Sequence, residues 1–382
     1  TTASTVTAEP GKTLTLTTAA ETITGGAGND TIAAVVTVTG TATTGTTLLP
    51  GDIINGGEGN DTLTISTAGT PTTAAYTIAA IQANSVENIM FNAYDNEERN
   101  DGTVLDLTLF TGLERVGTNS GSAKGDLKFT GAQNLLDIVI NNTAGDFDVT
   151  YPSALTSVLL GDQSQDIALA NVTGTVTVPG IETINVSTSL LASKLVDLEI
   201  DAAKLLTITG DKNLTITAAV NFFDNASGVA GAIDGVVDAS AFTGKLNFTA
   251  DSDEMDIRGG TANDTINMVA TLNGYDKIDG GDGTDTLTMN AAALGTQFAQ
   301  TTNIEALTFN PSTGNQAVNL AKVPASITTV TSNNSDSTDD TSSETVTFSN
   351  HTTQLIGVKH TVADLGVDGN GDGANITVTG AV

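Results

Sequence analysis

The sequence contains no cysteine, no tryptophan and few aromatic residues of any kind. Without cysteine, disulfide bonds and thiol catalysis are excluded, and any metal ligand has to be oxygen or histidine. Aromatic residues make up only 4% of the 382 residues, so the apolar core must come mainly from valine, isoleucine, leucine and alanine. Short β-branched side chains separated by glycine and asparagine favour strands and tight turns. They suit narrow stacked layers better than one bulky core.

Basic residues are also scarce: 13 Lys and Arg stand against 44 Asp and Glu, a formal net charge of −31. A chain this acidic repels a phosphate backbone, which argues against a nucleic-acid partner. Charge of this size also opposes compaction unless counter-ions are held, and divalent cations are the obvious candidates. No long apolar run appears, so no transmembrane segment is predicted. The first residues show no secretory signal peptide, so export would need another signal or a trimmed start.

Many short runs alternate apolar and polar residues, and glycine, asparagine and aspartate interrupt them, which is the pattern of many short strands. A second phrase also recurs: an apolar residue, glutamate, any residue and another apolar residue, followed by a strand-like run. It occurs at 86–89, 113–116, 181–184 and 304–307. A recurring unit of roughly 20–30 residues indicates a solenoid in which each coil stacks its strand on the last. Chance repetition in a threonine-rich sequence is the alternative.

Two parts of the chain resemble each other. GGEGNDTLTIS is followed by SVENIMFN, and GGDGTDTLTMN is followed by NIEALTFN. We therefore predict a duplicated module within a chain of four segments. These segments are 1–95, with one pair of glycine turns and the first strand module; 96–245, a strand-rich solenoid middle; 246–312, with the second pair of turns and its strand module; and 313–382, a C-terminal strand region.

Four segments share a glycine-rich pattern that ends in aspartate: 25–30, 56–61, 259–264 and 280–285. Each is followed by Thr and then by Ile or Leu, which starts a strand. Glycine adopts positive φ without steric cost, so such a turn can fold its carbonyl groups inward. Carbonyls and a carboxylate together form the oxygen cage that Ca²⁺ prefers. One turn supplies only part of a coordination shell, so a facing turn has to supply the rest, and this explains why the turns come in two close pairs.

The residues predicted to form the calcium sites are Gly26, Gly28, Asp30, Gly57, Gly59, Asp61, Gly260, Asp264, Gly281, Asp282, Gly283 and Asp285. In the third turn Ala262 replaces the third glycine of the pattern. A residue other than glycine at positive φ costs on the order of 1 kcal/mol, so that half-site is predicted to be weaker or differently shaped. Glycine-rich hairpin turns that bind no metal are the alternative interpretation.

These turns resemble the RTX calcium-binding nonapeptide repeat, GGxGxDx followed by an apolar residue, which builds parallel β-rolls in proteins secreted by Gram-negative bacteria. Three of the four turns fit the pattern fully, although they cover only a small part of the chain. The turns of a pair lie 31 and 21 residues apart rather than nine, which excludes a long β-roll. The resemblance implies an all-β chain with a parallel β-solenoid or β-helix-like architecture, in which Ca²⁺ clips neighbouring coils together.

The surroundings of the turns suggest a wider resemblance. VVDASAFTGKLNFTA at 236–250, followed by MDIRGGTANDTI, looks like the lattice-forming region of RTX-type bacterial surface-layer (S-layer) proteins of the Caulobacter and Campylobacter kind. The resemblance implies a secreted structural subunit that binds calcium and self-assembles into a lattice on the cell surface of a Gram-negative bacterium. It also implies that a region not in this chain holds outer-membrane lipopolysaccharide. An RTX-type secreted adhesin or ligand-binding module is the alternative.

Two further acidic stretches are candidate calcium sites. Asp368, Asn370 and Asp372 stand at alternate positions before a glycine, which is the opening half of an EF-hand-like loop. Thr379 stands where the glutamate of such a loop is expected, so an exposed turn is the alternative. The acids of 251–256 crowd directly before a glycine turn. Like charges this close repel one another unless a cation lies among them.

The sequence offers little for catalysis. It contains neither the HExxH motif of a zinc protease nor the GxSxG motif of a lipase, although both activities accompany RTX turns. Arg99, Arg115 and Arg258 are the only arginines, too few for the cationic groove of a lyase or epimerase that acts on acidic polysaccharides. We therefore predict that the chain is not an enzyme.

Overall fold

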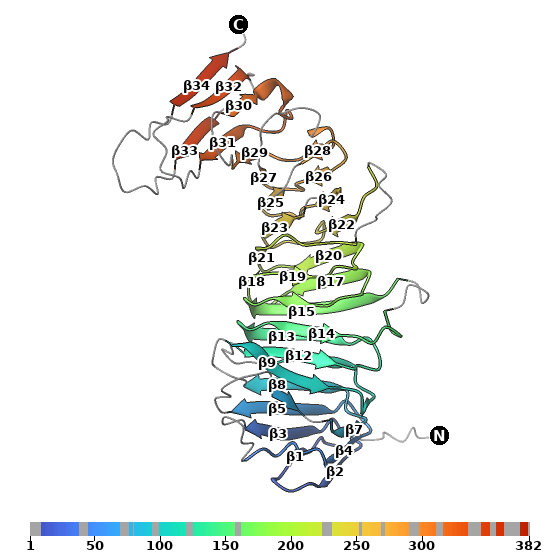
Figure 1. The fold of residues 1–382 in the computed structure, drawn as a ribbon. Helices are drawn as coiled ribbons and strands as arrows, with labels where there is room; N and C mark the ends of the chain where they lie inside the picture. The colour runs from blue at the N-terminus through green and yellow to red at the C-terminus, as the bar shows by residue number, and fades with distance from the viewer. Residues whose placement is uncertain are drawn as a thin grey trace, which may run out of the picture. The chain divides into compact units, whose positions relative to one another are not determined.

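The computed structural model describes residues 9–37, 45–68, 76–78, 80–93, 99–119, 125–156, 162–223, 231–251, 254–268, 272–289, 298–310, 316–334, 345–351, 357–362 and 375–380. Within these ranges the chain is an all-β solenoid, and every strand pair whose register is described is parallel (Figure 1). The predicted fold class is therefore confirmed. The chain divides into two compact units, Thr1–Ala202 and Ala203–Val382. The division into four segments stays a prediction.

The first unit contains three parallel sheets, in each of which the order of the strands in space follows their order in the sequence. Their orders are β1-β3-β5-β8-β11-β13-β15-β17, β2-β4-β7-β10 and β6-β9-β12-β14-β16-β19. The strands are β1 (Thr13–Thr15), β2 (Thr22–Gly26), β3 (Thr31–Thr37), β4 (Ile53–Gly57), β5 (Thr62–Ala68), β6 (Tyr76–Ile78), β7 (Gln82–Asn84), β8 (Asn88–Ala93), β9 (Arg99–Asp106), β10 (Phe110–Thr111), β11 (Arg115–Thr118), β12 (Gly125–Thr130), β13 (Asp137–Thr143), β14 (Phe147–Thr150), β15 (Ser164–Val172), β16 (Val176–Thr177), β17 (Thr183–Thr188), β18 (Ser193–Leu195) and β19 (Leu198–Glu199).

The second unit is built in the same way, with the strand orders β20-β22-β24-β26-β28, β21-β23-β25-β27-β29-β31-β33 and β30-β32-β34. Its elements are β20 (Leu205–Gly210), β21 (Leu214–Ile216), β22 (Gly235–Asp238), β23 (Leu246–Ala250), β24 (Met255–Arg258), β25 (Thr265–Met268), β26 (Lys277–Asp279), β27 (Thr286–Met289), β28 (Thr301–Thr302), β29 (Ala306–Phe309), β30 (Gln316–Asn319), the 3₁₀ helix η3 (Leu320–Lys322), β31 (Thr329–Asn334), β32 (Thr345–His351), β33 (Gly357–Val362) and β34 (Asn375–Gly380). Among the described residues, no helix has the length and apolarity needed to span a bilayer.

The length of a coil can be read from the strand register. Thr31 of β3 lies opposite Thr62 of β5, and Thr62 lies opposite Asn88 of β8, steps of 31 and 26 residues. In the second unit Thr265 of β25 lies opposite Thr286 of β27, a step of 21 residues. These steps agree with the coil length that the sequence predicts. The recurring glutamate phrase marks the start of a coil's strand, because Glu87, Glu114, Glu182 and Glu305 each directly precede a strand, namely β8, β11, β17 and β29.

The core is a column of apolar side chains that point inward from stacked strands. Ile32, Leu63 and Ile89 occupy equivalent positions on β3, β5 and β8, and each is fully buried. Because side chains alternate along a strand, the residues between them, such as Thr31 and Ala33 on β3, point away from this column. The few aromatic residues lie mostly inside, as in the pair Phe91 and Phe129, whose ring centroids are 5.9 Å apart. The narrow, stacked core predicted from composition is therefore the one observed.

Candidate calcium-binding turns

The glycine turns connect the strands of successive coils. Turns 25–30 and 56–61 lead from β2 into β3 and from β4 into β5, and turns 259–264 and 280–285 lead from β24 into β25 and from β26 into β27. Because β2 pairs with β4 and β24 pairs with β26, the two turns of each pair stack directly on one another. The structure therefore brings together the residues of each predicted pair and places the two pairs in different units.

Close packing of backbone on backbone explains why these turns begin with glycine. A Cβ on Gly25 would lie 1.9 Å from the carbonyl oxygen of Gly56, and one on Gly259 would lie 2.1 Å from the carbonyl oxygen of Gly280. No side chain fits at such distances, since even the smallest would have to push the next coil away. The coils therefore approach each other with their carbonyl oxygens at the contact.

Positive φ angles are confined to the second turn of each pair. Gly57 and Gly59 have φ of 118° and 125°, and Gly281 and Gly283 have φ of 89° and 134°. No glycine of the first turns has a positive φ, and neither does Ala262. The strain predicted at Ala262 is therefore absent, because that residue stands in a first turn, where the backbone does not need the left-handed region. The two turns of a pair share a sequence pattern but differ in conformation.

A ladder of carboxylates runs through the first pair of turns. Oδ1 of Asp30 accepts a hydrogen bond from the backbone N–H of Lys12 (2.6 Å), which lies in the preceding coil. Oδ1 of Asp61 accepts in the same way from the N–H of Asp30 (2.7 Å), and Oε2 of Glu87 accepts from the N–H of Asp61 (2.6 Å). We call this chain of contacts the carboxylate ladder. Each rung joins a carboxylate to the backbone of the coil before it.

The second unit repeats the carboxylate ladder. Oδ1 of Asp264 accepts from the N–H of Leu246 (2.8 Å), and Oδ1 of Asp285 accepts from the N–H of Asp264 (2.7 Å). Oε2 of Glu305 then accepts from the N–H of Asp285 (2.8 Å). Hydrogen bonds to a charged acceptor are about twice as strong as neutral ones, so the three rungs of the ladder fix the register of four successive coils in each unit.

Glu87 and Glu305 were not among the residues predicted for the sites. The sequence does contain the signal, because the apolar-Glu-x-apolar phrase follows each second glycine turn at the distance of one coil. The structure shows that this phrase is the third rung of the carboxylate ladder. It stands where a third glycine turn would stand, with glutamate in the role of the aspartate.

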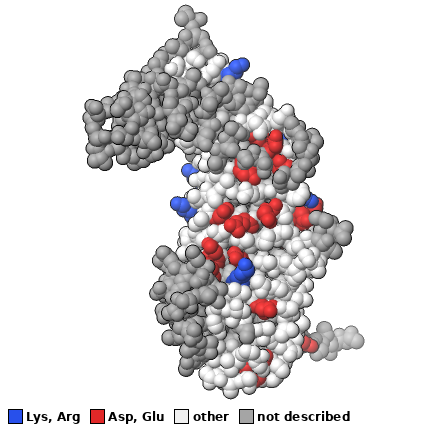
Figure 2. Space-filling model, viewed as in Figure 1, with Lys and Arg blue, Asp and Glu red and all other residues white. Residues whose placement is uncertain are grey.

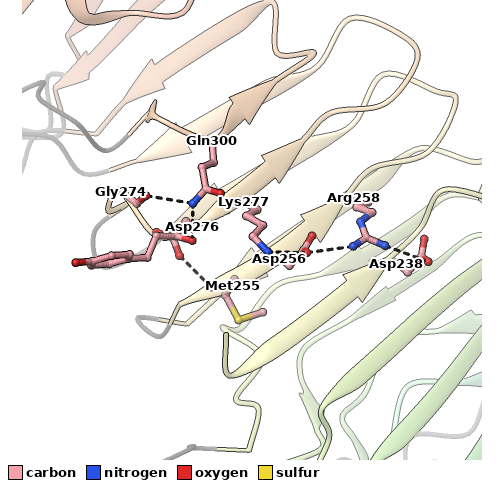
Figure 3. Close-up of polar contacts among 9 residues, drawn as sticks. Asp238, Met255, Asp256, Arg258, Gly274, Asp276, Lys277 and Gln300 are labelled. Atoms are coloured by element: carbon pink, nitrogen blue, oxygen red, sulfur yellow. Dashed lines mark hydrogen bonds and ion pairs between the residues drawn. The ribbon is translucent and has the colours of Figure 1, made fainter. Parts of the chain in front are cut away.

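The same device occurs away from the glycine turns. Oδ1 of Asp52 accepts from the N–H of Glu21 (3.0 Å), and Oδ1 of Asp276 accepts from the N–H of Met255 (3.0 Å; Figure 3). The second oxygen of each aspartate accepts from the N–H three residues before it, so both oxygens have a donor. A buried carboxylate with this set of partners serves as a purely structural link between coils.

In the first turn of each pair, the aspartate is likewise satisfied. Oδ2 of Asp30 accepts from the N–H of Gly26 (2.5 Å), and Oδ2 of Asp264 accepts from the N–H of Gly260 (2.7 Å). Together with the contacts of the ladder, these bonds give both oxygens of both carboxylates a backbone donor.

In the second turn of each pair, one carboxylate oxygen has no partner. Oδ2 of Asp61 and Oδ2 of Asp285 are buried and accept no hydrogen bond. The equivalent glycines, Gly57 and Gly281, are the ones with positive φ, and their N–H groups are not donated to these oxygens. An unpaired oxygen of a buried carboxylate is costly, and its appearance at the same position in both units indicates that a further group belongs there.

The electrostatics of the second turns also favour a cation. Asp61 is 0% and Asp285 1% exposed. Burial raises the pKa of Asp61, and it raises the pKa of Asp285 to about 6, with a further contribution from the neighbouring carboxylates of Asp264 and Glu305. Burial and the neighbouring carboxylates both disfavour the ionised form of the aspartate, and the positive charge of a bound cation would offset both.

The available ligands match the chemistry of Ca²⁺. Ca²⁺ prefers carboxylate and carbonyl oxygens in flexible geometry, and the stacked turns present both kinds. Within the described ranges, no three Asp, Glu or His side chains converge on one point. Carbonyl oxygens would therefore supply most of the ligands, with Asp61 or Asp285 as the charged one. Bound there, the ion would neutralise the buried carboxylate and tie adjacent coils together.

The remaining predicted residues differ in their exposure to solvent. Gly59 and Asp282 are exposed on the outer side of the second turns, although the N–H of Asp282 donates to the carbonyl oxygen of Gly260 (3.0 Å). Gly28 and Gly260 are buried in the first turns and Gly283 is exposed. The EF-hand-like residues Asp368, Asn370 and Asp372 lie outside the described residues.

Basic side chains neutralise part of the acidic run that precedes the third turn. Asp256 forms ion pairs with Arg258 (3.1 Å) and Lys277 (3.7 Å), and Arg258 also reaches Asp238 (3.8 Å). Figure 3 shows these side chains in a row across β22, β24 and β26. Asp256 therefore has its counter-charges within the protein and does not need a metal ion.

The pKa of Asp285 leads to a prediction for the metal-free protein. A carboxyl whose pKa is raised from 3.8 to about 6 by folding contributes stability at low pH, and this stability is lost as the pH rises through about 6. In chelator, the melting temperature should therefore fall between pH 4 and 7, and it should fall less in Asp285→Asn, which cannot ionise. Circular dichroism melts across this range would measure both. Equal pH dependence in the variant and the parent would contradict the assignment.

Comparison with known families agrees with this geometry. The family described as RTX calcium-binding nonapeptide repeat (4 copies) matches residues 17–34 and 51–64, which contain the first pair of turns. No curated protein matches the chain. Proteins with such repeats are typically secreted, which is consistent with an extracellular location. The chain thus carries RTX calcium-binding repeats on a parallel β-solenoid, and these repeats indicate a calcium-binding protein of the RTX type.

Proposed function

We propose that the chain is a calcium-dependent structural subunit of an extracellular surface layer on a Gram-negative bacterium, and that it self-assembles into a two-dimensional protein sheet. The observation that supports this proposal is the burial of the two unpartnered carboxylate oxygens, on Asp61 and Asp285. An ion bound there lies between packed coils. It can stiffen the stack but has no open face for a substrate, so a structural role fits better than an enzymatic one.

Surface charge is the second support. Acidic side chains outnumber basic ones on the face drawn in Figure 2, and the whole chain carries a net charge of −31. Copies of such a chain repel one another in the absence of cations. In our proposal Ca²⁺ therefore has two effects: it makes each solenoid rigid, and it bridges acidic edges of neighbouring copies. Attachment to outer-membrane lipopolysaccharide would be the task of a region not in this chain.

Electron microscopy of the purified protein tests the proposal. In millimolar Ca²⁺ we expect ordered sheets, whereas the same protein in excess chelator should remain dispersed. Mg²⁺ at equal concentration is the matched control, since it should screen charge without filling a site built for six to eight flexible oxygen ligands. Dispersed monomers in Ca²⁺ would contradict a lattice role and favour the alternative, a secreted RTX-type adhesin or ligand-binding module.

A further inference from the structure

The outer face of β24 and β26 carries charges of alternating sign. Strand register places Asp256 opposite Lys277, and it places Arg258 opposite Asp279. Neighbouring strands lie about 4.8 Å apart, and residues two positions apart on one strand are separated by about 7 Å. The four side chains therefore mark the corners of a small rectangle, and the sign of the charge changes along each of its edges. We call these residues the charge block: Asp256, Arg258, Lys277 and Asp279.

The charge block faces solvent. The residues between its members, Ile257 and Ile278, are buried in the core, so the four charged side chains point the opposite way. The side chains of Arg258 and Lys277 are 46% and 48% exposed. Two of the chain's 13 basic residues are therefore presented together, on a protein whose net charge is −31.

Ion pairs within the protein do not explain this regular alternation. Asp256 contacts both Arg258 (3.1 Å) and Lys277 (3.7 Å), and Asp279 accepts a hydrogen bond from the side-chain amide of Asn303 (2.8 Å). Ion pairs with exposed partners contribute little to stability, because water and salt screen them. A pattern of exposed charges has a larger effect on recognition, since it decides which surfaces can approach one another.

An alternating block of this shape is complementary to itself. Around a two-fold axis parallel to the strands, Asp256 would meet Lys277 of a second copy, and Arg258 would meet its Asp279. Around a two-fold axis that lies in the sheet and crosses the strands, Asp256 would meet Arg258 of the second copy, and Lys277 would meet its Asp279. In both orientations every charge of one copy faces an opposite charge of the other. Two-fold contacts between identical surfaces are the commonest kind in protein oligomers.

The residues around the block allow a second sheet to approach. Val236 and Asp238 of β22 flank the block on one side, and Thr302 of β28 flanks it on the other. None of these side chains is large enough to hold another copy away. An exposed tyrosine, Tyr275, stands two residues before Lys277, and tyrosine is enriched at protein interfaces.

We propose that this face of the second unit is a two-fold contact between copies of the chain, formed by the charge block. The partner is a second copy because the same four residues supply every opposite charge that they require. A purely acidic partner would be repelled by the two aspartates, and a purely basic one by Arg258 and Lys277. The inference rests on the proposed function in that copies assemble, and it names one surface at which they meet.

Sedimentation velocity of the full chain in CaCl₂, at concentrations below those that give sheets, tests the contact. The parent should form dimers. The acidic variant Arg258→Glu/Lys277→Glu and the basic variant Asp256→Lys/Asp279→Lys should each dimerise at least about tenfold more weakly, because each block then repels its own copy. An equal mixture of the two variants should restore dimers, each with one acidic and one basic chain.

Circular dichroism would show that each variant is folded, and Asp238→Lys/Asp256→Lys replaces the basic variant if that one does not fold. The matched control is Lys212→Glu/Lys322→Glu, which makes the same change in net charge as the acidic variant, in the same unit but outside β22, β24 and β26. It should dimerise like the parent. A monomeric parent, an acidic variant that dimerises as tightly as the parent, or a mixture that stays monomeric would overturn the inference.

Electron microscopy of the same samples at higher concentration separates this inference from the proposed function. If the parent forms sheets in Ca²⁺, the acidic variant should form none, and its mixture with the basic variant should form them again. Identical sheets of the parent and the acidic variant would overturn the inference and leave the proposed function standing. A parent that forms dimers but no sheets would overturn the proposed function and leave the two-fold contact standing.

Discussion

Excess chelator should lower the melting temperature of each unit by about 10 °C relative to the protein saturated with Ca²⁺. A ligand present at a thousand times its dissociation constant stabilises the folded state by about 4 kcal/mol, and 1 kcal/mol shifts the melting temperature of a unit of this size by about 2–4 °C. The structural reason is the pair of buried oxygens on Asp61 and Asp285, which have no partner without the ion. Differential scanning calorimetry in CaCl₂ and in EGTA would measure the shift.

Two controls test whether the shift in melting temperature comes from Ca²⁺ bound at Asp61 and Asp285. The double variant Asp61→Asn/Asp285→Asn should melt at nearly the same temperature in both buffers, because neither site retains its charged ligand. Mg²⁺ should restore less of the lost stability than Ca²⁺ does, since it demands octahedral geometry and keeps its water. Identical melting of the parent protein in CaCl₂ and in EGTA would mean that the glycine turns bind no calcium that matters to folding.

The second large effect is expected from Gly280→Ala. A Cβ at this position would lie 1.9 Å from the carbonyl oxygen of Asn303 and 2.8 Å from Cβ of Asp285. Both contacts involve parts of the chain that cannot rotate away, so two coils have to separate. Overpacking of this kind costs 1–3 kcal/mol, and the damage to an ion site adds to it, so we expect a loss of about 3 kcal/mol in the free energy of unfolding. Urea denaturation in Ca²⁺ would measure it.

Gly357→Ala is the matched control in the same unit. Its Cβ would meet nothing closer than 3.7 Å, an ordinary contact with the side chain of Thr329, and its φ is not positive. This substitution should change the free energy of unfolding by less than about 1 kcal/mol, and the smaller entropy of the unfolded chain favours a slight gain. Equal effects of Gly280→Ala and Gly357→Ala would contradict the close approach of the two coils at Gly280.

Sequence periodicity was enough to predict the fold, and the reason is physical. A parallel solenoid places equivalent residues one coil apart, so Ile32, Leu63 and Ile89 recur in the sequence at the spacing at which they stack. The glutamate phrases could be recognised for the same reason. The steps range widely from coil to coil, however, and a simple period search therefore gives only an approximate repeat. The boundary between the two units, after Ala202, leaves no clear mark in composition.

The distinction between the two turns of a pair could not be predicted. GGAGND and GGEGND are nearly identical, yet the N–H of Gly26 donates to Oδ2 of Asp30, whereas Oδ2 of Asp61 accepts no hydrogen bond from Gly57. Whether this glycine donates depends on the coil that follows the turn, and the six residues of the motif carry no information about that coil. The sequence also does not predict where a residue other than Asp or Glu accepts the equivalent hydrogen bond between two coils. At Leu136 the backbone N–H is accepted by the hydroxyl of Tyr151 (3.1 Å), a residue type that no acidic pattern would suggest.

The hydrogen bonds of the carboxylate ladder all run one way, and this gives the stack a polarity. Each acceptor belongs to the later coil: Glu182 receives the N–H of Gln163 (3.0 Å), just as Glu87 receives that of Asp61. If the later coil of a rung is removed, the coil before it loses the carboxylate that accepts its N–H. A backbone amide is then exposed to solvent at the C-terminal end of the shortened stack. If the earlier coil of a rung is removed instead, only the carboxylate of the later coil loses its partner, and water solvates a carboxylate readily. A truncation that shortens the stack from its C-terminal side should therefore fray it further than an equal truncation from the other side.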